Sequence, residues 1–215
     1  MRRQKNRGLR QFVLAEEAFA QGARCKVVQK ITALAPTDIK RLFTDEAKLH
    51  SNTGNMPSSI DWFVGKRSNM AGVQASHFYS YFWHQIDRGI DALEALIVAY
   101  RLYSRKCMES EKMDFDRAFF LITATHGFWA KKKQPSLEAA RCSDCESLHI
   151  GHLGLRYTAR QHCPICKARR VAMRSSNSSV PVVTTAYFPA VAPFDEAMPV
   201  LRKAVSRRLE APVSL

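Results

Sequence analysis

Four cysteines, arranged as two Cys-x-x-Cys pairs, constrain the fold of this 215-residue chain more than any other feature of its sequence. The first pair is Cys142 and Cys145, and the second pair, Cys163 and Cys166, follows after 17 intervening residues. Each pair can form a tight turn that directs two thiolates at one point, and two such turns complete the tetrahedral shell that zinc prefers. Pairs about 15–20 residues apart are typical of zinc sites. We therefore predict one structural Zn²⁺ per chain, bound by these four cysteines.

Three other roles for the cysteines fit the sequence less well. Disulfides are rare in the cytoplasm. The chain reads as cytoplasmic and not membrane-bound, because it has neither an apolar run of about 18 residues nor a signal-peptide cleavage pattern. A thioredoxin-like redox pair would need a βαβ pattern beside it. A catalytic zinc would need an open coordination position, and the His-x-Glu motif of the zinc deaminases is absent from the sequence.

The residues around the cysteines favour a small metal-stabilised module over 136–175. The stretch between the pairs has room for a short hairpin that turns at Gly151 or Gly154, so a zinc ribbon is the predicted form. It contains too little apolar material to fold alone, and the metal would supply the missing stability. His149, His152 and His162 are expected to be surface residues, because four thiolates already complete the shell.

The positive charge of the chain is concentrated in two segments. Residues 1–50 carry a net charge of +6, residues 51–130 carry none, residues 131–175 carry +7 and residues 176–215 carry +1. Clustered basic residues of this kind favour binding to a polyanion, chiefly nucleic acid. The alternative is that the charge only keeps the protein soluble, and the clustering favours nucleic acid.

The first basic segment, 1–50, reads as a helix-turn-helix-like region. Apolar spacing predicts a helix over 9–21 that stops at Gly22, a second helix containing Val28 and Ile31, and a third that starts near Pro36 or Thr37. A short helix pair whose second member is basic on its outer side is typical of DNA-reading domains. The turn lacks the usual glycine, so a plain αα-hairpin remains an alternative.

The neutral segment, 51–135, reads as an aromatic-rich helical bundle. Two helices over 74–105 are predicted to divide near Gly89, and another helix spans 114–131. Some of the aromatic rings are expected to face a partner chain. No Ser/His/Asp set, carboxylate pair or Gly-rich phosphate loop occurs in the sequence, so we predict that the chain is not an enzyme. Residues 176–215 are expected to form a flexible tail.

With these parts in place, the sequence resembles the FlhC family of bacterial flagellar transcriptional activators. The resemblance spans about residues 9–170 and rests on five features. They are the two cysteine pairs, in order, and the segments "GAR" (22–24), "SIDWF" (59–63), "VQASHF" (73–78) and "AYRLY" (99–103). It implies that the chain assembles with FlhD subunits into a heterohexamer, binds double-stranded DNA at flagellar promoters and recruits RNA polymerase. It also implies that the four cysteines bind zinc and that this subunit makes most of the DNA contact.

The predicted fold is mostly α, a helical bundle with an N-terminal helix-turn-helix-like region and a C-terminal zinc ribbon built on four cysteines. The predicted function is that of a DNA-binding activator subunit. The alternatives are a zinc-braced protein-interaction scaffold with only non-specific nucleic-acid affinity and, ranked lowest, a non-specific RNA binder. The candidate DNA-binding residues are Thr37, Lys40, Arg41, Arg156, Arg160, Lys167, Arg169 and Arg170.

Overall fold

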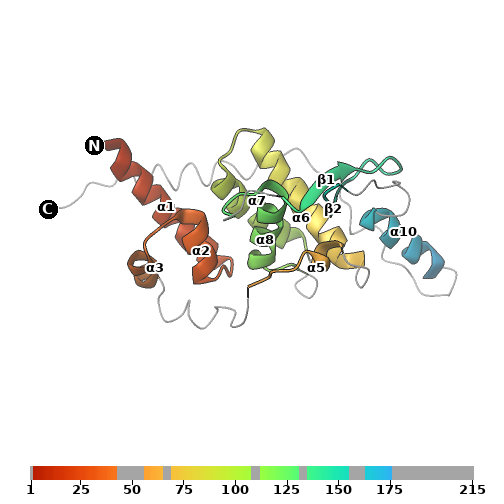
Figure 1. Ribbon diagram of the computed structural model, residues 1–215, viewed down its shortest axis with the longest axis horizontal. Helices are drawn as coiled ribbons and strands as arrows, with labels where there is room; N and C mark the ends of the chain where they lie inside the picture. Colours follow the sequence, from red (N-terminus) through yellow and green to blue (C-terminus); the bar gives the residue numbers. More distant parts are fainter. Residues whose placement is uncertain are drawn as a thin grey trace. The chain divides into compact units, whose positions relative to one another are not determined.

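The computed structural model describes residues 2–42, 56–64, 69–107, 112–130, 135–154 and 163–175. These residues form eight helices and two strands (Figure 1). The elements are α1 Arg2–Ala20, α2 Cys25–Thr32, α3 Pro36–Leu42, α5 Asp61–Val64, α6 Asn69–Asp87, α7 Ala92–Lys106, α8 Phe115–His126, β1 Leu137–Arg141, β2 Leu148–His152 and α10 Pro164–Ser175. The fold is therefore mostly α, as predicted. Within the described part of the chain, no helix has the length and apolarity needed to cross a bilayer.

The chain divides into two compact units, Met1–Val171 and Ala172–Leu215. In the first unit, α6 and α7 pack along each other and α8 packs against both (Figure 1). A single buried core draws on α1, α2, the three bundle helices and both strands. The predicted segments 1–50, 51–135 and 136–175 thus share one core in the structure. The predicted tail, 176–215, lies outside the described residues.

The core of the bundle consists largely of aromatic rings on α6, α7 and α8. Phe78 and Phe82 of α6 are fully buried, and Tyr103 of α7 contacts Phe78 edge-on at 5.8 Å between ring centroids. The Tyr103 hydroxyl donates to Gln74 Oε1 at 2.7 Å and accepts from the Met113 backbone N–H at 2.8 Å. Trp83 differs from these rings because 43% of its surface is exposed.

The helix boundaries follow local sequence signals, and two of them differ from the prediction. Gly89, with a φ of +77°, separates α6 from α7 as predicted. However, α1 begins at Arg2, well before the predicted residue 9. Helix α8 ends at His126 rather than 131, because Gly127 caps it in the left-handed conformation. Trp129 therefore lies beyond the helix, with a φ of +58°.

Two ion pairs join α1 to α7. Arg10 of α1 pairs with Glu94 of α7. Seven residues further along both helices, Glu17 lies 3.8 Å from Arg101. Because both positions advance together, the two helices run in the same direction along this contact. The N-terminal region is thus fixed to the bundle by charges as well as by the buried Leu14, Ala15 and Ala18.

Candidate metal centre and nucleic-acid interface

The four cysteines come from two different kinds of local structure. Cys142 and Cys145 form the turn between β1 and β2, which pair antiparallel with Arg141 opposite Leu148. The Cys142 backbone N–H donates to Ser147 O at 3.0 Å, and the Glu146 N–H donates to Cys142 O at 2.9 Å. Glu146 completes this turn in the left-handed conformation.

A hairpin turn at Gly151 was the wrong prediction, and the residues that would follow a turn at Gly154, 155–162, lie outside the described residues. The strands turn at the first cysteine pair, whereas Gly151 lies inside β2 and Gly154 lies after its end. The second pair, in turn, opens a helix. Cys163 precedes α10, Cys166 lies in its first turn, and the Lys167 N–H donates to Cys163 O at 3.0 Å. In its described residues, 135–154 and 163–175, the module is therefore one hairpin and one helix that meet at the cysteines.

The four sulfur atoms have the spacing of a tetrahedral metal shell. All four lie within 4.8 Å of one another. The Sγ atoms of Cys142 and Cys166 are 3.7 Å apart, and those of Cys145 and Cys163 are 3.9 Å apart. Four ligands around zinc at about 2.3 Å would be separated by about 3.8 Å. The residues that the sequence indicated therefore meet at one point and fit a metal ion.

The electrostatics of the cluster also favour a bound cation. Burial raises the pKa of Cys163 to about 11, although the N–H groups of Cys166 and Ile165 donate to its sulfur. Burial would likewise raise the pKa of Cys145, but hydrogen bonds from Ser147 and the neighbouring thiols lower it to about 7. The Cys145 thiolate thus forms readily while the Cys163 thiol resists ionisation, as its raised pKa shows. A divalent cation would offset the repulsion that four thiolates would otherwise generate.

The cysteine module is firmly packed onto the bundle. Leu137 of β1 and Ile150 of β2 belong to the shared core, and β2 packs against α5 and α6. The prediction that His149 is a surface residue was wrong, since its side chain lies in β2 and is only 3% exposed. His152 is half-buried, and His162 lies outside the described residues.

The candidate DNA-binding residues of the N-terminal region lie on one exposed helix. Thr37, Lys40 and Arg41 are all exposed on α3, while Ile39 faces the core. Helices α2 and α3 are joined at Ala33, which adopts the left-handed conformation with a φ of +54°. Alanine thus occupies the turn position where a glycine is usual, which explains why the sequence lacked that signal.

The candidate residues of the second basic segment are only partly described. Arg169 and Arg170 are exposed on α10 and Lys167 is half-buried there. The apolar Val171 and Met173 on the same helix are more than half exposed. Arg156 and Arg160 lie outside the described residues. Lys167, Arg169 and Arg170 follow directly after Cys166 in the chain.

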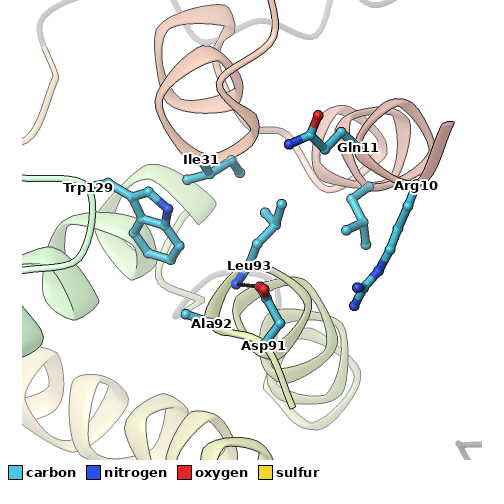
Figure 2. Close-up of a pocket in the computed structure, with 8 residues that line it drawn as sticks. Arg10, Gln11, Ile31, Asp91, Ala92, Leu93 and Trp129 are labelled. Atoms are coloured by element: carbon cyan, nitrogen blue, oxygen red, sulfur yellow. Dashed lines mark hydrogen bonds between the residues drawn. The ribbon is translucent and has the colours of Figure 1, made fainter. Parts of the chain in front are cut away.

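A separate pocket of about 270 Å³ lies where α1, α2 and the start of α7 converge (Figure 2). Leu14, Ile31, Leu93 and Trp129 provide its apolar lining. Its remaining lining residues are Arg10, Gln11, Asp91 and Ala92. Asp91 caps α7, since its carboxylate accepts from the Leu93 N–H at 2.8 Å. No local sequence pattern predicts this pocket, because its walls come from distant segments.

Comparison with known protein families decides the class of the chain. Residues 4–179 match the model of the flagellar transcriptional activator family, FlhC. The chain belongs to the FlhC family. The matched range includes α3, the bundle, all four cysteines and α10. Members of this family are transcriptional regulators of flagellum biogenesis, which is not a class of enzyme.

Individual relatives agree with the family match. The flagellar transcriptional regulator FlhC of Burkholderia lata is 28% identical over 164 residues, covering 74% of this chain and 70% of the relative. The FlhC of Verminephrobacter eiseniae is 28% identical over 161 residues, covering 73% of this chain and 81% of the relative. The FlhC of Sodalis glossinidius is 33% identical over 118 residues, covering 53% of this chain and 59% of the relative.

Proposed function

We propose that this FlhC-family chain is the DNA-binding subunit of a complex with FlhD that activates flagellar promoters by recruiting RNA polymerase. The observation that carries the proposal is that all four cysteines converge at the start of α10, a helix with exposed arginines, in a chain of an activator family. A metal bound there would fix the base of α10 against the bundle. Arg169 and Arg170 would then be presented to DNA from a rigid support.

The metal in this proposal is Zn²⁺, one per chain, with a structural role. Cys142, Cys145, Cys163 and Cys166 would hold it, and four thiolates leave no position open for a substrate. Zinc bound in this way would supply folding free energy to a hairpin and a helix that have little core of their own. The spacing of the sulfurs and the N–H donors aimed at Cys163 support this assignment.

The DNA-binding surface in this proposal combines α3 and α10. Lys40 and Arg41 on α3 and Arg169 and Arg170 on α10 are exposed, and no acidic residue occurs in α10. Phosphate contacts by such residues position a protein on DNA, while base contacts specify the sequence. Thr37, in the first turn of α3, is a candidate for base contact because the start of a recognition helix enters the major groove. Arg156 and Arg160 remain candidates from the sequence.

Promoter binding by paired variants tests the proposal. The complex of this chain with FlhD would be titrated against a flagellar promoter fragment and a scrambled fragment over a salt series. Lys40→Ala with Arg41→Ala, and Arg169→Ala with Arg170→Ala, should each weaken binding and flatten its salt dependence by about one unit of log–log slope per lost phosphate contact. Arg105→Ala with Lys106→Ala is the matched control, because both residues are exposed at the end of α7. Unchanged promoter binding by both test pairs would refute the proposal.

The alternative function, a zinc-braced scaffold, is favoured by one observation. Trp83, Val171 and Met173 are exposed at 43%, 57% and 56%, and such apolar groups often mark protein contacts. In the proposed complex these residues are candidates for the FlhD interface. A scaffold would bind its partner protein normally but would not distinguish the promoter from the scrambled fragment.

A further inference from the structure

Gly72 of α6 lies in a confined space at the start of α10. A Cβ atom built at residue 72 would lie 2.9 Å from Pro164 Cβ and 3.3 Å from Pro164 Cγ. It would also lie 3.1 Å from the carbonyl oxygen of Phe63. Carbon atoms in contact are ordinarily about 3.5–4.0 Å apart. No other residue type would fit at position 72 without displacing α10 or the end of α5.

Three elements meet at this glycine. Phe63 of α5 is buried and stacks on Phe120 of α8, so its carbonyl group is held in place. Pro164 lies between Cys163 and Cys166, and its ring stiffens the backbone that directs both sulfurs. The contact at Gly72 therefore connects the bundle directly to the metal-binding cysteines.

We propose that Gly72 is a positioning residue: the absence of its side chain seats Pro164 on α6 and so sets the direction of α10 relative to the bundle. The DNA-binding part of this inference rests on the proposed function. A metal bound by the four cysteines would hold the second pair to the hairpin, and the contact of Pro164 with Gly72 holds the same pair to α6. Together, these two contacts would fix the first turn of α10, Pro164–Lys167.

A tilt of α10 at its first turn, where Pro164 contacts Gly72, would move the arginine side chains that lie further along the helix. Helix α10 has 12 residues, which corresponds to a length of about 18 Å. Pro164 is its first residue, and Arg169 and Arg170 lie between one and two turns away. A rigid helix that tilts at its first turn moves these guanidinium groups away from the phosphates that they would contact. Contacts with phosphates depend on where the guanidinium groups lie relative to the DNA backbone.

Gly72→Ala tests the contact between Gly72 and Pro164 directly. The variant and the parent chain, each in complex with FlhD, would be compared by zinc content, by hydrogen–deuterium exchange of 61–64 and 163–171, and by promoter affinity. We expect the zinc content to be kept, exchange in both segments to increase, and promoter affinity to fall about tenfold, the equivalent of about one lost contact. Gly8→Ala on α1 is the matched control, because a Cβ there meets nothing within 4 Å. It should change none of these quantities.

A second variant separates a specific clash from general damage. Gly72→Ala combined with Pro164→Gly removes the Pro164 carbons that the new Cβ would meet, and it should bring exchange in 163–171 and promoter affinity back toward those of Pro164→Gly alone. Pro164→Gly alone is the reference for this comparison, because it measures what the loss of the stiffening ring does by itself. Exchange in Gly72→Ala that equals the parent, or a loss of zinc that the combined variant does not reverse, would overturn the inference. A third outcome is that exchange increases in Gly72→Ala and is restored in the combined variant while promoter affinity never changes. That outcome would support the role of Gly72 in positioning α10 and would refute the proposed role of α10 in DNA binding.

Discussion

Arg24 Nε lies 2.6 Å from Asp116 Oδ2, and this ion pair joins the turn between α1 and α2 to the first turn of α8. The Arg24 backbone N–H also donates to Asp116 Oδ1 at 3.2 Å. The Asp116 side chain is 1% exposed and that of Arg24 is 17% exposed. Arg24 ends the "GAR" segment of the family resemblance. The pair thus gives that segment a physical role in fixing the N-terminal region to the bundle.

Asp116→Asn should destabilise the chain by about 3 kcal/mol, because it removes the carboxylate that offsets the buried guanidinium of Arg24. Arg24→Leu should cost a similar amount. The combined variant should cost less than the sum of the two, since no charge is then left in the interface. Urea unfolding of the three variants measures this. If the combined variant lost as much unfolding free energy as the two single variants together, the two charges would not act as a pair.

The control for this prediction is Glu94→Gln, which breaks a more exposed ion pair with Arg10 on the same N-terminal region. Exposed pairs contribute about 0–1 kcal/mol because water screens them. If Glu94→Gln lowered the free energy of unfolding as much as Asp116→Asn does, burial would not determine how much each ion pair contributes to stability.

Ala33→Gly should stabilise the chain by about 1 kcal/mol. Ala33 adopts a left-handed conformation, which costs an L-residue with a Cβ about 1–2 kcal/mol and costs glycine little. Ala168→Gly, inside α10, should have the opposite effect because glycine is unfavourable in a helix interior. Thermal unfolding of both variants checks the prediction. A lower melting temperature for Ala33→Gly would contradict it.

Removal of the metal should loosen the cysteine module more than the bundle. Chelation of the zinc-loaded chain is expected to increase hydrogen exchange in 137–152 and 163–171, since the metal would provide much of the stability of those segments. The Phe78 and Tyr103 region of α6 and α7 should change less, because its packing does not involve the cysteines. Cys145→Ser should reproduce the effect of chelation. Equal exchange before and after chelation would argue against a structural metal.

Stability should fall as the pH drops through the region near 6.5, partly because of His126. Burial lowers the pKa of His126 below its usual value of 6.5, so the folded state binds a proton less readily than the unfolded state. The stability that the neutral ring provides is fully present above pH 6.5, the pKa of the unfolded state. It is lost as the pH falls from there through the lower pKa of the folded state. His126 Nε2 lies 3.0 Å from the Tyr79 hydroxyl, with which it forms a hydrogen bond.

Melting temperatures across the acidic range up to neutral pH measure this dependence. His126→Gln keeps a polar partner for Tyr79 and removes the titrating ring, so its melting temperature should depend less on pH than that of the parent. His77, whose pKa burial also lowers, would account for part of the remaining slope. An unchanged slope in His126→Gln would exclude His126 as a source.

The sequence predicted best where a local pattern determines the structure. The division of the bundle at Gly89 and the convergence of the four cysteines both follow from residue type and spacing. A turn at Gly151 was wrongly predicted because glycine is a common turn signal, whereas the cysteine pair at 142–145 supplies the turn between β1 and β2. The seat of Pro164 on Gly72 joins residues far apart in the chain, and no local pattern encodes it.

The two ion pairs between α1 and α7 also bear on how these helices are aligned. Arg10 faces Glu94 and Glu17 faces Arg101, so the order of charges is reversed from one helix to the other. A shift of α1 by seven residues in one direction would bring Arg10 to Arg101, and a shift in the other would bring Glu17 to Glu94. Either slip juxtaposes like charges. The charges therefore disfavour a seven-residue slip of α1 along α7 in either direction.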